Sequence, residues 1–71
     1  MKPESVTILA NGKEEHVDLP CSVANFVTGR GWKPTQVVAE YNGKVLERAE
    51  LTQTMLKAGD SLEVILAVAG G

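Results

Sequence analysis

The sequence has 71 residues, of which 44% are hydrophobic and 23% are charged, and its formal net charge is −2. A chain of this length makes a single small domain and leaves little room for an enclosed active-site pocket. Seven Lys plus Arg against nine Asp plus Glu, with no basic cluster and no apolar run near ~18 residues, indicate no nucleic-acid partner and no membrane segment.

The first half of the chain begins with a predicted β-hairpin. We expect a flexible lead-in over residues 1–5 and a first strand over the β-branched run 6–10, which ends at Asn11-Gly12. An Asn-Gly pair between two strand-like runs favours a type I′ turn, because both central residues of that turn need positive φ. Residues 13–19 form the second strand, and Pro20 ends it because proline cannot donate to a strand ladder.

A short helix is predicted after this hairpin. Ser22 occupies the N-cap position, where its hydroxyl can accept from a free backbone amide of the first turn. Val23, Phe26 and Val27 then share one face of the helix. Gly31 is placed as the residue just after the C-cap, where a left-handed backbone is common.

The second half of the chain predicts three more strands. In chain order these are residues 37–41, a brief strand at 44–46, and residues 61–68. Asn42-Gly43 joins the first two of them as a second tight turn. Residues 49–55 are ambiguous, with a turn of 3₁₀ helix as one interpretation, and residues 57–60 have turn chemistry. The last strand is the most apolar, which is typical of the middle of a sheet.

The order strand, strand, helix, strand, short strand, strand predicts an α+β fold. One helix covers one face of a mixed sheet of four to five strands, and parallel pairing of the first and last strands requires a right-handed crossover. We therefore expect one β-grasp (ubiquitin-like) domain over residues 1–71, with the first and last strands parallel and central.

The most informative feature is the ending Val68-Ala69-Gly70-Gly71, which follows the last strand directly. We expect residues 69–71 to be a flexible tail. Because glycine has no Cβ, Gly70 and Gly71 can lie extended in a channel too narrow for other residues. A free carboxylate there is ionised at neutral pH and can attack the α-phosphate of ATP held by another protein. A terminal Gly-Gly by itself is a weak signal, since many chain ends only fray.

Three segments together resemble the bacterial sulfur-carrier proteins of thiamine biosynthesis, the ThiS family. They are VAEYNGKVLER at residues 38–48, GDSLEV at residues 59–64, and VAGG at residues 68–71. The similarity runs in register from Ile8 to Gly71, and the spacing of the turns to the terminal Gly-Gly is its most specific part.

The resemblance implies a carrier that is acted on by other proteins and is not itself an enzyme. By position, Gly71 would bear an acyl-adenylate and then a thiocarboxylate, while Gly70 and Ala69 would thread the tail into the partner's active site. Many members have glycine where this chain has Ala69. The implied partners are a ubiquitin-activating-type adenylyltransferase, which consumes ATP, a thiazole synthase, and a sulfur donor such as a cysteine desulfurase. No cofactor would be bound by this chain, and the location would be cytoplasmic.

A partner-docking surface is predicted on the sheet face away from the helix. Leu9, Val38 and Ile65 are out of phase with the inward positions of their strands, so they point to the uncovered side. Val68 is assigned to the same surface. The simpler alternative is that scattered surface aliphatic residues are normal.

The remaining reactive side chains give no sign of catalysis. A lone cysteine, Cys21, excludes an internal disulfide, and a single histidine, His16, leaves no metal site with the usual ligands. We expect Cys21 to pack as a small apolar residue at the start of the helix, His16 to be solvated, and Trp32 to cover the core.

Three functions remain open from the sequence. The first is the thiamine-type sulfur carrier. The second is a ubiquitin-like modifier that joins Gly71 to lysines of target proteins, or a sulfur carrier for molybdopterin, cysteine or homocysteine synthesis. The third is a β-grasp binding module whose glycine ending is incidental.

Overall fold

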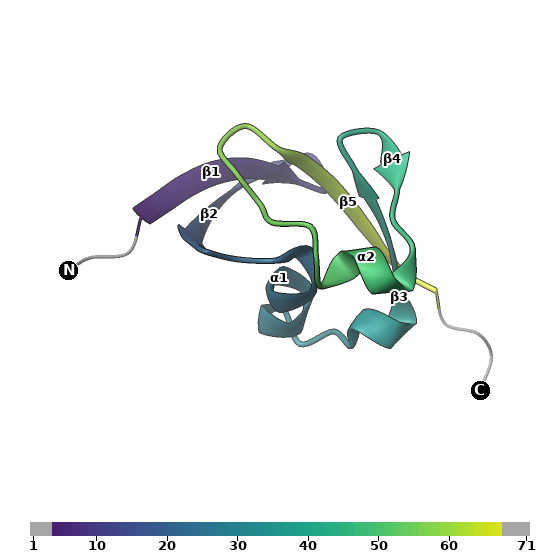
Figure 1. The fold of residues 1–71 in the computed structure, drawn as a ribbon. Helices are drawn as coiled ribbons and strands as arrows, with labels where there is room; N and C mark the ends of the chain where they lie inside the picture. Colours follow the sequence, from purple (N-terminus) through teal and green to yellow (C-terminus); the bar gives the residue numbers. More distant parts are fainter. Residues whose placement is uncertain (1–3, 68–71) are drawn as a thin grey trace.

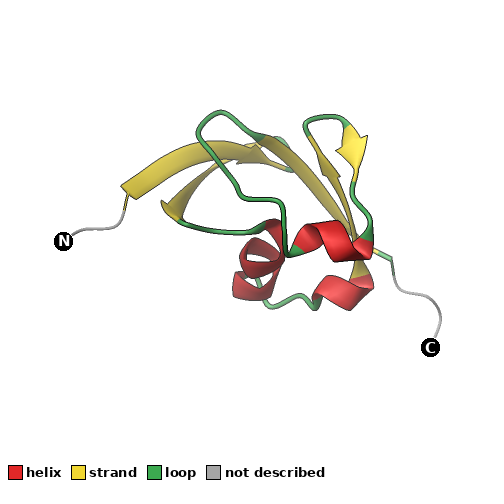
Figure 2. Ribbon diagram, in the orientation of Figure 1, coloured by secondary structure: helices red, strands yellow, loops and turns green. Residues whose placement is uncertain are grey.

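The structure, a computed structural model, describes residues 4–67 as one five-stranded sheet with short helices on one side (Figures 1 and 2). The strands are β1 (Glu4–Ala10), β2 (Lys13–Leu19), β3 (Val37–Tyr41), β4 (Lys44–Val45) and β5 (Ser61–Leu66). The helices are α1 (Val23–Gly29), the 3₁₀ turn η1 (Pro34–Gln36) and α2 (Arg48–Leu51).

The strand order is β2-β1-β5-β3-β4, with β5 in the centre. β1 and β5 are parallel, whereas β1 with β2, β3 with β4 and β3 with β5 are antiparallel. This confirms the predicted mixed sheet, its β-grasp topology and the parallel pairing of the first and last strands. It also places the most apolar strand where both of its edges are hydrogen-bonded, as its composition favours.

Both predicted Asn-Gly turns are confirmed. Asn11 and Gly12 have φ of 52° and 81°, and Asn42 and Gly43 have φ of 50° and 88°. Two consecutive positive φ values are the signature of the type I′ turn, whose twist matches that of the flanking strands. Each turn therefore connects its two strands without splaying them.

Helix α1 is capped as the sequence predicts. The Ser22 hydroxyl accepts a hydrogen bond from the Asn25 backbone amide at 3.0 Å. At the other end, Arg30 is the C-cap and Gly31 follows with φ of 85°. Since α1 has only seven residues, its own hydrogen bonds cannot hold it, and packing of its apolar side against the sheet must do so.

The core lies between the sheet and the helices. Ile8, Leu62, Val23 and Val27 are its largest fully buried side chains. Ala39 and Val64 also point inward, as predicted from the strand phase. The sheet thus has one face packed against α1 and one face without helical cover, as Figure 2 shows.

Three predicted boundaries were wrong. The brief strand expected at residues 44–46 is β4, which ends at Val45. β1 begins at Glu4, not after residue 5, because the hairpin register pairs Glu4 with Leu19 and Ser5 with Asp18. The flexible lead-in predicted for residues 1–5 is therefore too long by Glu4 and Ser5, and residues 1–3 lie outside the described part. β5 ends at Leu66, two residues before the predicted end at Val68, which also lies outside it.

Residues 48–51 form a short α-helix in place of the suggested 3₁₀ turn. A capping box explains its start: the Glu50 carboxylate accepts from the Glu47 amide at 2.8 Å, and the Glu47 side chain accepts from the backbone of Glu50. The turn η1, which immediately precedes β3, was not predicted.

Candidate functional site

The candidate site combines an apolar sheet face with the end of the central strand. We call the side of the sheet opposite α1 the open face. Leu9, Val38 and Ile65 point to it and are 46%, 39% and 64% exposed, which confirms the predicted orientation of all three. Val68, the fourth residue predicted for this surface, lies outside the described residues.

The strand register determines how these residues lie together. Val38 on β3 is directly opposite Ile65 on β5, so their side chains are cross-strand neighbours on the open face. Leu9 lies on the other side of β5, where β1 pairs with Ser61. Val45 on β4 was missed by sequence reasoning. It is opposite Glu40, points to the same face and is 58% exposed. The apolar surface therefore extends across four strands.

β5 directs the chain toward the edge of the domain beside η1. Leu66 is paired with Val37, and the Ala67 backbone amide donates to the Gln36 carbonyl at 2.8 Å. These two contacts fix the last described residues to the sheet and to η1. The predicted tail residues Ala69, Gly70 and Gly71 lie outside the described part, so their assignment stays a prediction.

The other end of β5 is held by a buried carboxylate that sequence reasoning did not identify. Asp60 is 2% exposed. It accepts hydrogen bonds from the Tyr41 hydroxyl at 2.7 Å, from the Asn42 side-chain amide at 3.2 Å, and from both the backbone amide and the Nζ of Lys57 at 2.8 and 2.7 Å. The sequence signal for this cluster is only the turn composition of residues 57–60.

Electrostatics agree with an ionised Asp60. Burial by itself would raise the pKa of this carboxyl, but the hydrogen bonds from Lys57, Tyr41 and Asn42 outweigh it and hold the pKa below its usual value. The contact with Asp60 is also the main reason why the pKa of Lys57 is raised. The cluster is thus a structural ion pair with all of its acceptor capacity in use.

Cys21, His16 and Trp32 occupy structural positions. Cys21 is partly buried, and burial raises the pKa of its thiol, which disfavours the nucleophilic thiolate. His16 is exposed on β2, with its Nδ1 3.1 Å from the Thr7 hydroxyl. Trp32 packs partly buried against the core, as predicted.

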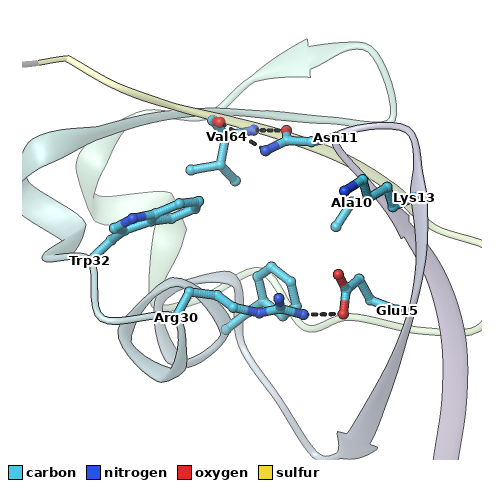
Figure 3. A pocket seen from close by; sticks show the side chains of 8 residues that line it. Ala10, Asn11, Lys13, Glu15, Arg30, Trp32 and Val64 are labelled. Atoms are coloured by element: carbon cyan, nitrogen blue, oxygen red, sulfur yellow. Dashed lines mark hydrogen bonds and ion pairs between the residues drawn. The ribbon is translucent and has the colours of Figure 1, made fainter.

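A groove of about 370 Å³ opens between α1 and the β1–β2 turn (Figure 3). Its lining residues are Ala10, Asn11, Lys13, Glu15, Phe26, Arg30, Trp32 and Val64. An ion pair between Arg30 and Glu15 crosses it, and the Arg30 guanidinium lies 4.8 Å from the centre of the Phe26 ring. Within residues 4–67 no buried side-chain nitrogen or oxygen lacks a hydrogen-bond partner. Among the polar side chains of the groove, Arg30 is paired with Glu15, and Asn11 is hydrogen-bonded to the backbone of Val64.

The described residues contain no group of three or more His, Cys, Asp and Glu side chains arranged to hold a metal ion. The same part of the chain has no helix long and apolar enough to cross a membrane. The described residues provide an apolar surface and a central strand that ends beside η1.

Comparison with known proteins supports the same interpretation. The model of the ThiS family matches residues 7–71. The crystal structure of a thiamine biosynthesis protein (ThiS) from Geobacter metallireducens is similar, with a TM-score of 0.76 and 30% sequence identity. The similarity covers 93% of this chain and 100% of that one. No curated protein sequence gives a significant match.

Proposed function

This chain belongs to the ThiS family, and we propose that it is a sulfur carrier of thiamine biosynthesis that works through the carboxylate of Gly71. The observation that carries the proposal is the extent of the family match. It begins in β1 and continues to residue 71, so the Gly70-Gly71 pair lies within the matched range.

The chemistry proceeds in two steps at the Gly71 carboxyl group. First, a carboxylate oxygen attacks the α-phosphorus of ATP in the active site of a ubiquitin-activating-type adenylyltransferase, and pyrophosphate leaves. Second, the terminal sulfur of a persulfide on a donor such as a cysteine desulfurase attacks the activated acyl carbon, and AMP leaves. A thiol then reduces the resulting acyl disulfide, which releases the thiocarboxylate on Gly71 and leaves a disulfide between that thiol and the donor cysteine. The terminal thiocarboxylate then passes its sulfur to a thiazole synthase. ATP is consumed by the partner, and this chain supplies only the acyl group.

The role of the domain is to present that carboxylate at a defined place. Because β3 pairs with β5 as far as Leu66 and the Ala67 amide is fixed to Gln36, the position from which residues 68–71 leave is set by β3 and η1. Gly70 and Gly71 lack a Cβ, and Ala69 has the smallest side chain after glycine, so these residues suit a narrow access channel.

Docking of the partners is assigned to the open face. Leu9, Val38, Ile65 and, by sequence, Val68 would contact the adenylyltransferase and the thiazole synthase. Large exposed aliphatic side chains gathered on one face are typical of interaction surfaces. Ile65 lies one residue before the end of β5, so a protein docked there is close to the base of the tail.

The proposal is tested by reconstituting the first step with purified adenylyltransferase and ATP. We expect pyrophosphate release that depends on this chain and that is lost when Gly71 is deleted. A chain that lacks Gly71 still ends in a carboxylate. The deletion therefore tests whether the carboxylate has to lie at the position of residue 71, and not whether a negative charge is present. The melting temperature should stay the same, because the sheet and the core are built from residues 4–67. Equal pyrophosphate release by the two proteins would overturn the assignment of Gly71.

A further inference from the structure

Acidic and basic side chains are distributed unequally between the two sides of the sheet. Three carboxylates outside the open face contact basic groups, in the pairs Glu15–Arg30, Lys44–Glu50 and Lys57–Asp60. By strand register, the open face carries the carboxylates Glu14, Asp18, Glu40 and Glu63 together with His16. None of the described strand residues that point to this face is a lysine or an arginine.

Two of these carboxylates are direct cross-strand neighbours. Glu40 on β3 is opposite Glu63 on β5, and Glu40 is half-buried. Like charges directly opposite in an antiparallel pair destabilise a sheet. No ion pair within residues 4–67 involves either of them. The described part of the chain therefore places two carboxylates on adjacent strands of one face without a basic partner, and a cation from outside would supply one.

The same two residues are surrounded by the exposed aliphatic side chains of the open face. Val38 and Ile65 form the next pair on this face along β3 and β5, and Val45 is opposite Glu40 on β4. Val45 and Ile65 are both more than half exposed. The unpaired carboxylates thus lie inside the apolar surface, where binding of a partner would remove them from water.

We propose that Glu40 and Glu63 form an anionic receptor within the open face, and that the docking protein inserts an arginine or lysine between them. The partner surface that fits is aliphatic next to Val38, Val45 and Ile65 and basic opposite the glutamates. This inference rests on the proposed function, since it assigns that chemistry to the adenylyltransferase. Complementary charge of this kind mainly accelerates association and suppresses wrong partners.

A second copy of this chain is the less suitable occupant of the face. A two-fold dimer through an isologous interface would place the same carboxylates of both copies against one another. Neither copy contributes a lysine or arginine from the described strand residues of this face to offset that repulsion.

The decisive experiment measures association of the full chain with purified adenylyltransferase by stopped-flow at several salt concentrations. We expect the double variant E40Q/E63Q to associate about tenfold more slowly at low salt, with a much weaker salt dependence than the unaltered protein. The control E4Q/E15Q makes the same change in net charge on the helix side and should associate at nearly the original rate. Equal rates and salt dependence for E40Q/E63Q and this control would overturn the proposal.

A second variant separates binding from folding. Glu40→Lys replaces the like-charge pair with an opposite-charge pair, so the melting temperature should rise by a few degrees while association slows further. A fall in melting temperature would contradict the repulsive pair.

If Ile65→Asp abolishes association while E40Q/E63Q leaves it unchanged, the proposed docking stands and only the anionic receptor is wrong. If sedimentation shows that the unaltered chain dimerises and that Ile65→Asp prevents it, a second copy is the occupant and the proposal fails.

Discussion

At the scale of single residues, Asp60 is the most constrained polar group in the described chain. Its carboxylate accepts four hydrogen bonds from three residues, Tyr41, Asn42 and Lys57, and it lies directly before β5. A buried charge is tolerated only when it is paired and hydrogen-bonded, and breaking such a set costs much more than an exposed ion pair contributes. Asp60 therefore fixes the start of the central strand.

The first prediction concerns the replacement Asp60→Asn. It keeps the shape but removes the charge and turns one acceptor into a donor that faces Lys57, so the free energy of unfolding should fall by about 2 kcal/mol. Chemical denaturation at neutral pH measures this. Asp18→Asn, which alters an exposed carboxylate on β2, is the matched control and should change stability by less than about 0.5 kcal/mol.

The same contacts predict a pH dependence. The folded-state pKa of Asp60 lies below its unfolded value of about 3.9, so its stabilising effect is complete above that value and is lost as the pH falls through the folded pKa. The stability difference between the unaltered protein and Asp60→Asn should therefore shrink as the pH is lowered from about 5. A difference that stays constant down to pH 3 would show that Asp60 is not preferentially ionised in the folded state.

Ile65 tests the open face with a single side chain. Ile65→Asp should lower the affinity for the adenylyltransferase at least tenfold, because a carboxylate would be buried in the apolar contact next to Glu63. Folding should be nearly unaffected, since Ile65 is 64% exposed. Met55→Asp alters an exposed apolar residue outside the sheet and serves as the control. Titration calorimetry measures the affinity of each variant for the adenylyltransferase. If Ile65→Asp binds as tightly as Met55→Asp, the open face is not the docking surface.

At the scale of elements, the two Asn-Gly turns do more than reverse the chain. The Asn11 side chain accepts from the Val64 amide at 2.8 Å and donates to the Val64 carbonyl at 3.2 Å, so it extends the ladder between β1 and β5 beyond the end of β1. The Asn42 side chain accepts from the Ser61 amide at 2.8 Å and donates to Asp60. Both turns thereby fix β5 from opposite sides.

The consequence can be measured with Asn11→Gly. Glycine adopts the positive φ of this position readily, so the turn survives and only the side-chain hydrogen bonds to β5 are lost. We expect unfolding to require about 1–2 kcal/mol less free energy. Hydrogen exchange of the Val64 amide should be faster, while exchange in α1 should change only as much as global stability does. If the Val64 amide exchanges as slowly in Asn11→Gly as in the unaltered protein, the Asn11 side chain does not hold β5 in place.

The sequence was sufficient for the order and type of the main elements, because their signals are local. Asn-Gly turns, the Ser22 cap and the period-two alternation of β1, β3 and β5 each specify structure within a few residues. The alternation also predicted that Leu9, Val38 and Ile65 all point to the open face.

What sequence reasoning missed depends on contacts between distant segments. The burial of Asp60 requires Tyr41 and Asn42, which are 19 and 18 residues away, and the role of Asn11 requires Val64, 53 residues away. The extension of the open face to Val45 follows from the β3–β4 register and from no local pattern. The sequence placed Gly71 through family resemblance, and the described residues neither confirm nor contradict it.

At the scale of the whole molecule, residues 4–67 form a rigid support, and the proposed chemistry takes place at Gly71. The side chains of Asn11 and Asn42 hydrogen-bond to β5 or to the residue before it, so the central strand is held in place. The open face and the end of β5 therefore keep a fixed position relative to each other. A partner that binds the face therefore receives the chain end at a reproducible position, which is what activation of a carboxylate requires. Substitutions on the open face should reduce binding, whereas changes at Gly71 should reduce chemistry with binding retained.

The intact mass of this protein after incubation with ATP, adenylyltransferase and sulfur donor tests the central claim most directly. We predict that the mass increases by the difference between one sulfur and one oxygen atom, that fragmentation localises the increase to Gly71, and that omission of ATP prevents it. An unaltered mass with partners shown to be active, or isopeptide-linked adducts to lysines of other proteins in its place, would contradict a sulfur carrier.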